Sequence, residues 1–168
     1  MGFAYHWKRG EANFGPPIEE QVPGGTHITF EVVLTMDGQY VALRRPRGIP
    51  DHEIPTHASK HPEGLCYFCH GLIRYGESVE ACVSRLVREQ AGVGVRSIRI
   101  IDIDSHVQEK DGQWAFNPIV LASLDALPSV SEEITEVVVF DAPTIPTDLA
   151  WWSIEEMREF IESLADTS

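Results

Sequence analysis

Apolar and polar side chains alternate near residue 30 as they do in a half-buried strand. In residues 28–35 apolar side chains alternate with Thr and Glu, and a period of two places one face of a strand on the core. Asp37-Gly38 is a tight-turn pair, and residues 40–43 form an apolar run after it. Together these features predict a first β-hairpin.

Four later stretches also predict strands. They are rich in β-branched and aromatic residues, and two of them are joined around Asp111-Gly112, which predicts a second hairpin. The predicted strands cover residues 65–70, 96–106, 114–122 and 134–140.

Two helices are predicted between and after these strands. Residues 78–91 form the first, with Ser78 as the N-cap and Gly92 as a left-handed stop. The sequence Ser153-Ile-Glu-Glu156 is a capping-box pattern and begins a second helix with one apolar stripe. Strands flanked by helices at two points predict an α/β or α+β sandwich.

Length and Pro/Gly content predict the domain organisation. The chain has 168 residues, which suits a single domain with a substantial core. Residues 1–25 are rich in Gly and Pro and predict an irregular arm, so residues 26–168 form the predicted domain. Residues 45–63 contain four prolines and three histidines and predict a loop of unusual length.

Residues 71–93 resemble the Nudix box, written G-x5-E-x7-R-E-U-x-E-E-x-G-U, where U is aliphatic. Leu86 and Gln90 depart from the pattern, since the box has glutamate at both positions, and in this sense the motif is degenerate. The resemblance extends loosely over residues 26–165 and implies a Nudix-type α/β/α sandwich with a mixed β-sheet. Seven positions match: Gly71, Glu77, Arg85, Val87, Glu89, Gly92 and Val93.

The resemblance also implies a metal site on the first helix. In the family, glutamates at the positions of Leu86, Glu89 and Gln90 hold magnesium, and residues three and four apart share one helix face. Glu89 is therefore the predicted catalytic residue and principal ligand for Mg²⁺ or Mn²⁺, with Gln90 as an auxiliary ligand. Glu132 or Glu133, ahead of the strand at 134–140, is the candidate replacement carboxylate.

Other box residues are expected to serve structure. Glu77 and Arg85 resemble the pair that ties the loop to the helix in the family, while Gly71 and Gly92 allow the backbone to bend. Outside the box, Arg44 and Arg45 are candidate phosphate contacts, although a solvated basic edge explains them equally well.

Two functions follow from the resemblance. The first is a metal-dependent pyrophosphohydrolase that cleaves a nucleoside diphosphate linked to another moiety. The second is a non-catalytic Nudix-fold protein that binds a ligand or a partner. Family membership favours the first, whereas Leu86 and Gln90 favour the second, because one carboxylate and one neutral amide make a weak magnesium site.

Charge and composition limit the classes of binding partner that are expected. The formal net charge of −13 argues against a nucleic-acid polymer, because phosphate backbones are bound by clustered Lys and Arg, and leaves a small nucleotide-type ligand. No apolar run approaches the ~20 residues needed to span a membrane, and no secretory signal is evident. Three cysteines give no disulfide framework and suggest the cytoplasm. A homodimer is left open.

Residues 66–70 match the C-x-x-C-H pattern of c-type haem attachment. On a strand, however, Cys66 and Cys69 point to opposite faces, so haem is not expected. Zinc is not expected either: His52, His57, His61 and His70 lie near these cysteines, but without the paired spacing of a zinc site.

Overall fold

The computed structural model describes residues 24–46, 64–109 and 111–165, so most of the predicted arm at 1–25 and of the loop at 45–63 lies outside the described residues. The described elements are β1 (Thr26–Met36), β2 (Gln39–Arg44), β3 (Cys66–Tyr67), β4 (Cys69–Leu72), α2 (Val79–Ala91), β5 (Val95–Val107), β6 (Trp114–Leu124), β7 (Glu136–Phe140), the 3-10 helix η3 (Ala142–Thr144) and α3 (Ile154–Ala165).

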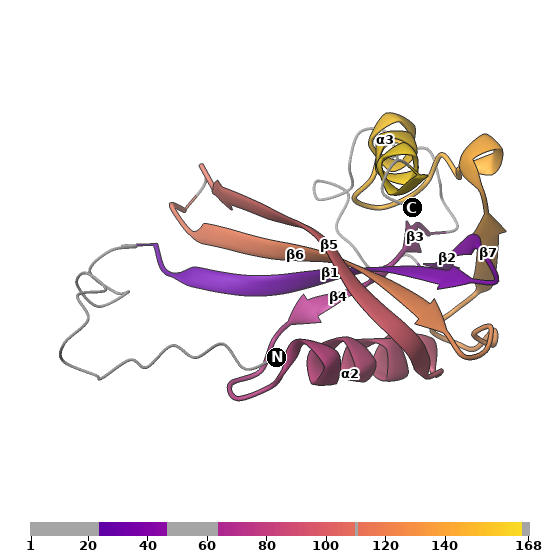
Figure 1. Ribbon diagram of the computed structural model, residues 1–168, viewed down its shortest axis with the longest axis horizontal. Coiled ribbons are helices and arrows are strands. Elements are labelled where there is room, and N and C mark those ends of the chain that lie inside the picture. Colours follow the sequence, from indigo (N-terminus) through magenta and orange to yellow (C-terminus); the bar gives the residue numbers. More distant parts are fainter. Residues whose placement is uncertain (1–23, 47–63, 110, 166–168) are drawn as a thin grey trace.

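The strands form one mixed sheet with the order β3-β2-β1-β6-β5, to which β4 adds beside β1 and β7 beside β2. β1 and β6 run parallel, and every other pair of these strands is antiparallel. α2 lies on one face of the sheet and α3 on the other (Figure 1). The predicted α/β/α sandwich with a mixed sheet is therefore confirmed.

Both predicted hairpins are present. Asp37 (φ 50°) and Gly38 (φ 85°) are left-handed and join β1 to β2, with Met36 opposite Gln39. This is the two-residue turn that matches strand twist. β5 pairs with β6 over their whole length, and Gly112 is left-handed (φ 71°) in the connection.

The single strand predicted at 65–70 is wrong in one respect, because the segment forms two short strands. β3 pairs with β2 and β4 pairs with β1, and Phe68 lies between them. The cause lies in the first hairpin. β1 pairs with β2 only at residues 34–36, so β4 takes the free side of β1 at residues 29–32.

The ends of the two helices follow the sequence signals. Ser78 Oγ accepts a hydrogen bond from the Ala81 N–H over 3.2 Å, and Gly92 ends α2 with φ 72°. At the start of α3, the Ser153 N–H donates to Glu156 Oε2 over 2.8 Å, and the Glu156 N–H donates to Ser153 Oγ over 3.2 Å. This is the reciprocal capping box expected from Ser153-Ile-Glu-Glu156.

The sheet separates two apolar clusters. Phe30, Val32 and Leu34 of β1 pack with the buried side of α2. Val33 packs on the other face with Met157 and Phe160 of α3. β1 is therefore covered on both faces at its centre, and its side chains alternate between the two clusters as the period of a strand requires.

Candidate functional site

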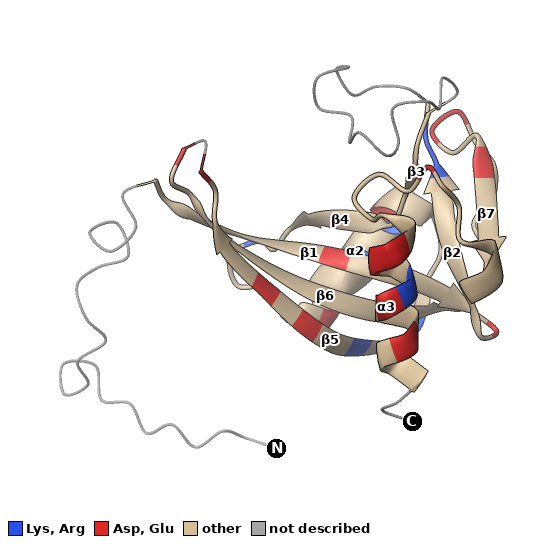
Figure 2. Cartoon of the chain, turned by 90° about the horizontal axis from the view of Figure 1, so that it is seen from above, with Lys and Arg blue, Asp and Glu red and all other residues tan. Residues whose placement is uncertain are grey.

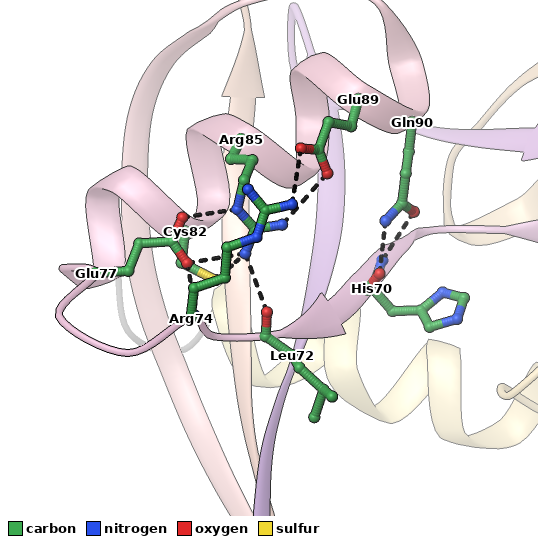
Figure 3. Close-up of polar contacts among 8 residues, drawn as sticks. All are labelled: His70, Leu72, Arg74, Glu77, Cys82, Arg85, Glu89 and Gln90. Atoms are coloured by element: carbon green, nitrogen blue, oxygen red, sulfur yellow. Dashed lines mark hydrogen bonds and ion pairs between the residues drawn. The ribbon is translucent and has the colours of Figure 1, made fainter.

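An ion pair with little exposure holds the loop of the box segment (residues 71–93) to α2. Arg85 Nε donates to Glu77 Oε1 over 2.6 Å, and Arg85 Nη2 donates to Oε2 over 2.8 Å. Glu77 Oε2 also accepts from the Arg74 N–H over 2.9 Å. These contacts, first among them the hydrogen bonds from Arg85, hold the pKa of Glu77 at about 2. The structure thus brings together the two residues that the resemblance assigns to this role (Figure 3).

Leu86 fills the space between α2 and β4. It is buried and packs in the same cluster as Cys82 and Val83. A Cβ added to Gly71 would lie 2.7 Å from Leu86 Cδ2, so a side chain at 71 and the leucine at 86 compete for one space. The position that resembles a metal-binding glutamate is thus occupied by a core residue.

Side chains from α2 complete the outer edge of β4, the edge that faces away from β1. Gln90 Oε1 accepts from the His70 N–H over 3.2 Å, and Gln90 Nε2 donates to the His70 carbonyl over 2.6 Å. Arg85 Nη2 donates to the Leu72 carbonyl over 3.0 Å. The helix thus supplies the hydrogen bonds that a further strand would otherwise make (Figure 3).

Glu89 points away from Gln90. Arg74 Nη2 donates to Glu89 Oε1 over 3.2 Å and Arg85 Nη1 donates to Oε2 over 3.3 Å, and 48% of the glutamate side chain is exposed. Gln90 extends toward β4 instead (Figure 3). The side chains of the two predicted box ligands therefore have different partners.

A cavity of about 310 Å³ lies at the C-terminal end of α2. Glu89 and Gln90 line it from the helix, and Glu133 lines it from the segment before β7. The neighbouring Glu132 is exposed and lies outside this lining. We call this space the α2-end cavity. In the described part of the chain, no three His, Cys, Asp or Glu side chains gather closely enough to hold a metal ion.

The two arginines predicted as phosphate contacts lie in different environments. Arg44 Nε donates to Glu136 Oε2 over 2.6 Å, and Arg44 Nη1 is bonded to the buried carboxylate of Asp148. Its charge is thus balanced within the fold. Arg45 Nη2 donates to the Gln90 carbonyl over 3.0 Å, which places its cation beside the end of α2.

A second cavity, of about 320 Å³, lies on the opposite face of the sheet and is called here the α3-side pocket. The aromatic rings of Trp151 and Trp152 line it, and 49% of Trp151 is exposed. The polar residues lining it are Thr29, Glu31, His70, Asp104 and Asn117.

Glu31 and His70 lie directly opposite each other in the pairing of β1 with β4. Trp152 Nε1 donates to Glu31 Oε1 over 3.1 Å. Burial raises the pKa of Glu31 to about 7, against the lowering effect of the Trp152 hydrogen bond, and burial lowers the pKa of His70. A carboxyl that titrates near neutral pH beside an imidazole is a typical feature of a functional site.

A larger groove, of about 590 Å³, continues from the pocket between β5 and α3 and shares Trp152 and Ile119 with it. Its charged lining residues are Arg99, Asp102, Glu156 and Glu159. In Figure 2 the acidic positions of β5 and α3, coloured red, lie along the same side of the molecule. This face therefore disfavours a ligand that exposes several phosphates along it.

Cys66 and Cys69 lie in the two different apolar clusters, on opposite faces of the sheet, as the strand period requires. Burial raises the pKa of each thiol to about 12. The two sulfurs therefore do not form a joint ligand pair. The loop histidines considered for zinc, His52, His57 and His61, lie outside the described residues.

Sequence reasoning missed Glu31 as a member of a pocket, whereas Trp151-Trp152 were considered as rings that could stack a base. The alternation of β1 correctly placed Glu31 on the face opposite Phe30, but that face was taken only as the polar side of a half-buried strand. The apolar stripe of the C-terminal helix was the available signal, because such a helix must cover a second sheet face. Trp151-Trp152, immediately before that helix, belongs to the same signal.

Comparison with known proteins identifies the family. A family model described as the NUDIX domain matches residues 25–164. The chain belongs to the Nudix family. Nudix relatives among characterised proteins include the NAD-capped RNA hydrolase NudC of Mycobacterium tuberculosis, 28% identical over 108 residues. That match covers 64% of this chain and 30% of NudC, so the chain spans under a third of the length of this relative.

Solved Nudix structures share the fold. The MutT NUDIX hydrolase from Burkholderia pseudomallei superposes with a TM-score of 0.57 at 18% identity, over 78% of this chain and 97% of that one. The Bacillus subtilis pyrophosphohydrolase BsRppH superposes with a TM-score of 0.59 at 13% identity, over 83% of this chain and 82% of that one. At these identities the likeness shows the fold alone.

These findings bear on the predicted partners. Nudix hydrolases act on small nucleotide-type substrates, in agreement with the predicted ligand class. The predicted exclusion of nucleic-acid polymers is not supported, because the NudC relatives are named for capped RNA. Within the described ranges no helix is long and apolar enough to cross a membrane. The cytoplasmic location and the homodimer stay predictions.

Proposed function

We propose that this Nudix protein is a weak, metal-dependent pyrophosphohydrolase that cleaves a nucleoside diphosphate linked to another moiety. One observation supports the proposal most: Glu89 and Glu133 line one cavity, although they are far apart in sequence. Magnesium is commonly held by one or two carboxylates together with substrate phosphates and waters. The residues present therefore fit Mg²⁺ or Mn²⁺ once the substrate is bound.

In this proposal Glu89 and Glu133 hold the metal, and Glu132 directly precedes Glu133 in the chain. Gln90 is left out, because both heteroatoms of its amide are bonded to His70. A divalent ion bound there would neutralise phosphate oxygens and lower the pKa of a water. Arg74 and Arg85, which contact Glu89, add positive charge close to where the diphosphate would bind.

The test is product formation by liquid chromatography with Mg²⁺ or Mn²⁺. Substrates are ADP-ribose, NADH, dinucleoside polyphosphates and nucleoside triphosphates, together with NAD and NAD-capped RNA because of the NudC relatives. Glu89→Gln and Glu133→Gln should each lower turnover by about tenfold or more, the usual effect of losing a metal ligand or its support. Glu80→Gln, exposed on α2 and outside the cavity, is the matched control and should keep full activity.

A second candidate function is ligand binding without cleavage. Leu86 is buried in the core, and the Gln90 side chain is hydrogen-bonded to the backbone of His70. Both side chains therefore stabilise the fold, which favours this candidate. Saturable binding of one of these compounds with no product formation would select this candidate. Turnover that persists in Glu89→Gln would instead place the chemistry outside the box.

A further inference from the structure

β5 forms one edge of the sheet. It stands last in the strand order, and within the described part of the chain it pairs with β6 alone, so its other edge is open (Figure 2). The strand is 13 residues long, which is more than most strands reach. Three of its apolar side chains are strongly exposed: Ile100 (48%), Ile103 (46%) and Val107 (62%). A long open edge with exposed apolar side chains is a template for pairing with another strand.

A β-bulge divides β5 into two halves. The register with β6 shifts between Ile100 and Asp102, so Ile101 is the extra residue. Ile100 lies opposite Val120, which packs in the apolar cluster on the α2 face. Asp102 lies opposite Ile119, which packs in the cluster on the α3 face. Because facing residues share a face of the sheet, even-numbered residues of β5 face α2 before the bulge and α3 after it.

This change of face makes the two halves of β5 complementary to each other. Two antiparallel copies of the strand can be paired so that Ile101 of each lies opposite Asp102 of the other. In this register Ile100 of one copy lies opposite Ile103 of the second copy, and both side chains lie on the α2 face. Without the bulge, positions 100 and 103 would lie on opposite faces and could not meet. The same surface of both copies is used, as a two-fold contact requires.

The charges of β5 also match in this register. Arg99 and Asp104 are exposed on the α3 face, and Arg99 of one copy lies opposite Asp104 of the second copy. Asp102 is a diagonal neighbour of the same arginine, within reach of a long side chain. Within one chain, His106 Nδ1 and Asn117 Nδ2 contact Oδ2 of Asp104, at 2.8 and 3.3 Å. A carboxylate has a second oxygen that can accept from an arginine.

The open edge presents backbone groups to such a partner. The Gln108 N–H donates to the Gln113 carbonyl over 2.8 Å, across the connection to β6. Because N–H groups alternate in direction along a strand, residues 106, 104 and 102 also turn their N–H groups to β6, and Ile103 turns its N–H to the open edge. There the Ile103 N–H donates to Asp102 Oδ1 over 2.8 Å. A strand paired at this edge would offer a backbone carbonyl in place of that side chain.

We propose that two copies of this chain pair antiparallel along β5, with a two-fold axis between Ile101 and Asp102. The two sheets then form one continuous sheet, with both α2 helices on one face and both α3 helices on the other. Arg99 of the second copy lies beside Asp104, which lines the α3-side pocket. Each copy therefore contributes a cation to the border of the other copy's pocket. The pairing does not depend on the proposed hydrolysis.

The test measures self-association of the full chain by sedimentation velocity over a wide range of protein concentration. The wild type should form dimers and no larger species, because the pairing covers both β5 edges. Arg99→Asp places a carboxylate opposite Asp104, and Asp104→Arg places a guanidinium opposite Arg99. Each variant should dimerise about tenfold or more weakly, because attraction becomes repulsion twice across the two-fold axis. The two changes shift the net charge in opposite directions, so net charge does not explain a common loss.

Mixing the two single variants gives the sharpest measurement. In a heterodimer of Arg99→Asp with Asp104→Arg, one chain is acidic at both positions and the other is basic at both. The mixture should therefore dimerise at least as well as the wild type, although each variant alone is mainly monomeric. The double variant Arg99→Asp/Asp104→Arg, which exchanges the charges within one chain, should dimerise like the wild type. Arg158→Asp, exposed on α3, makes the same charge change away from β5 and is the matched control.

Each outcome supports or overturns the pairing. A wild type that stays monomeric at every concentration would overturn it, as would a dimer that both single variants leave unchanged. Single variants that lose the dimer without regaining it in the mixture would overturn the register. An equal loss in Arg158→Asp would attribute the effect to net charge and would also overturn the pairing. Circular dichroism checks the fold, and if one single variant does not fold, the other single variant and the double variant carry the test.

Discussion

Both faces of the sheet carry titratable side chains, but the two sets differ in their partners. On the α2 face, a leucine stands at a position where the box has glutamate, and the charges of Glu77, Arg85 and Glu89 are paired with one another. On the α3 face, Glu31 and His70 are half-buried and line a pocket, and Glu31 accepts a hydrogen bond from Trp152. On the α2 face, hydrogen bonds from Arg85 lower the pKa of Glu77, whereas on the α3 face burial raises the pKa of Glu31.

The comparison shows that residues that match the family motif and residues with a shifted pKa are distinct sets that overlap only in part. In the box segment, Gly71, the Glu77–Arg85 ion pair and the Ser78 cap build the loop and the helix, although neither position 86 nor position 90 carries a carboxylate. A shifted pKa, by contrast, can arise from a paired charge, as at Glu77, or from burial without one, as at Glu31. The following experiments test this contrast, in order of decreasing expected effect.

Leu86→Glu should have the largest effect. It places a carboxylate in the cluster between α2 and β4, where the leucine is only 2% exposed. We expect a loss of about 4 kcal/mol or more in the free energy of unfolding, measured by urea denaturation, because an unpaired charge is buried. Leu72→Glu is the matched control: Leu72 is 57% exposed, and the change should cost less than about 1 kcal/mol. A stable Leu86→Glu protein that gains magnesium-dependent turnover would show that the α2 face retains a latent metal site.

Glu31→Gln should remove a pH dependence. The pKa of Glu31 is raised from 4.5 to about 7 by burial, so the folded state binds more protons than the unfolded state over that range. Its contribution to stability therefore falls as pH rises from about 4.5 to 7, by about 3 kcal/mol. At pH 8, Glu31→Gln should be more stable than the wild type by this amount, and at pH 4 nearly equal.

His70 acts in the opposite sense, since its lowered pKa favours folding as pH rises toward its ordinary value. It is present in both proteins, so the difference between the two stability curves isolates Glu31. Glu162→Gln, exposed on α3, is the control and should leave the curve unchanged. A flat difference between wild type and Glu31→Gln across this range would mean that Glu31 is solvated.

Gly71→Ala should have a smaller effect that depends on Leu86. The added methyl would lie 2.7 Å from Leu86 Cδ2, so the leucine must shift within a packed cluster. We expect a cost of about 1–2 kcal/mol. Leu86→Val shortens the side chain and should relieve part of it in a double-mutant cycle. Additive costs would show that the two residues do not share the space.

The three thiols should give the smallest effect of all. Cys66, Cys69 and Cys82 are buried, and burial raises the pKa of each. A disulfide reagent at pH 8 should label none of them in the folded protein, and all three in urea. Rapid labelling of one thiol under native conditions would reveal local opening on its face of the sheet.

Much of the fold could be predicted because local signals encode it. Asp37-Gly38 fixed the first hairpin, and Ser78 with Gly92 bounded α2, because turns and caps depend on neighbouring residues. The division of residues 65–70 could not be predicted, since it depends on where β2 leaves β1. The parallel pairing of β1 with β6 is likewise set by packing over the whole sheet.

The candidate site was less predictable for a related reason. The roles of Glu77 and Arg85 were implied by the resemblance to the Nudix box, and the structure pairs the two side chains. The partner of Gln90 depends on which edge of β4 is open, and the environment of Glu31 depends on where α3 docks. Both depend on contacts between residues far apart in the chain, which the hydrophobic period of a single strand or helix does not reveal.

The parallel pairing of β1 with β6 also has a consequence for folding. Thr26 lies opposite Trp114, 88 residues later in the chain. During synthesis the first strand emerges long before this neighbour, and the box with its helix is complete while one side of β1 is still open. Closing so long a loop is entropically costly and slow. We therefore expect the pairing of β1 with β6 to be a late folding step. Until β6 has been synthesised, one edge of β1 is unpaired, and the nascent chain is most prone to aggregation at this stage.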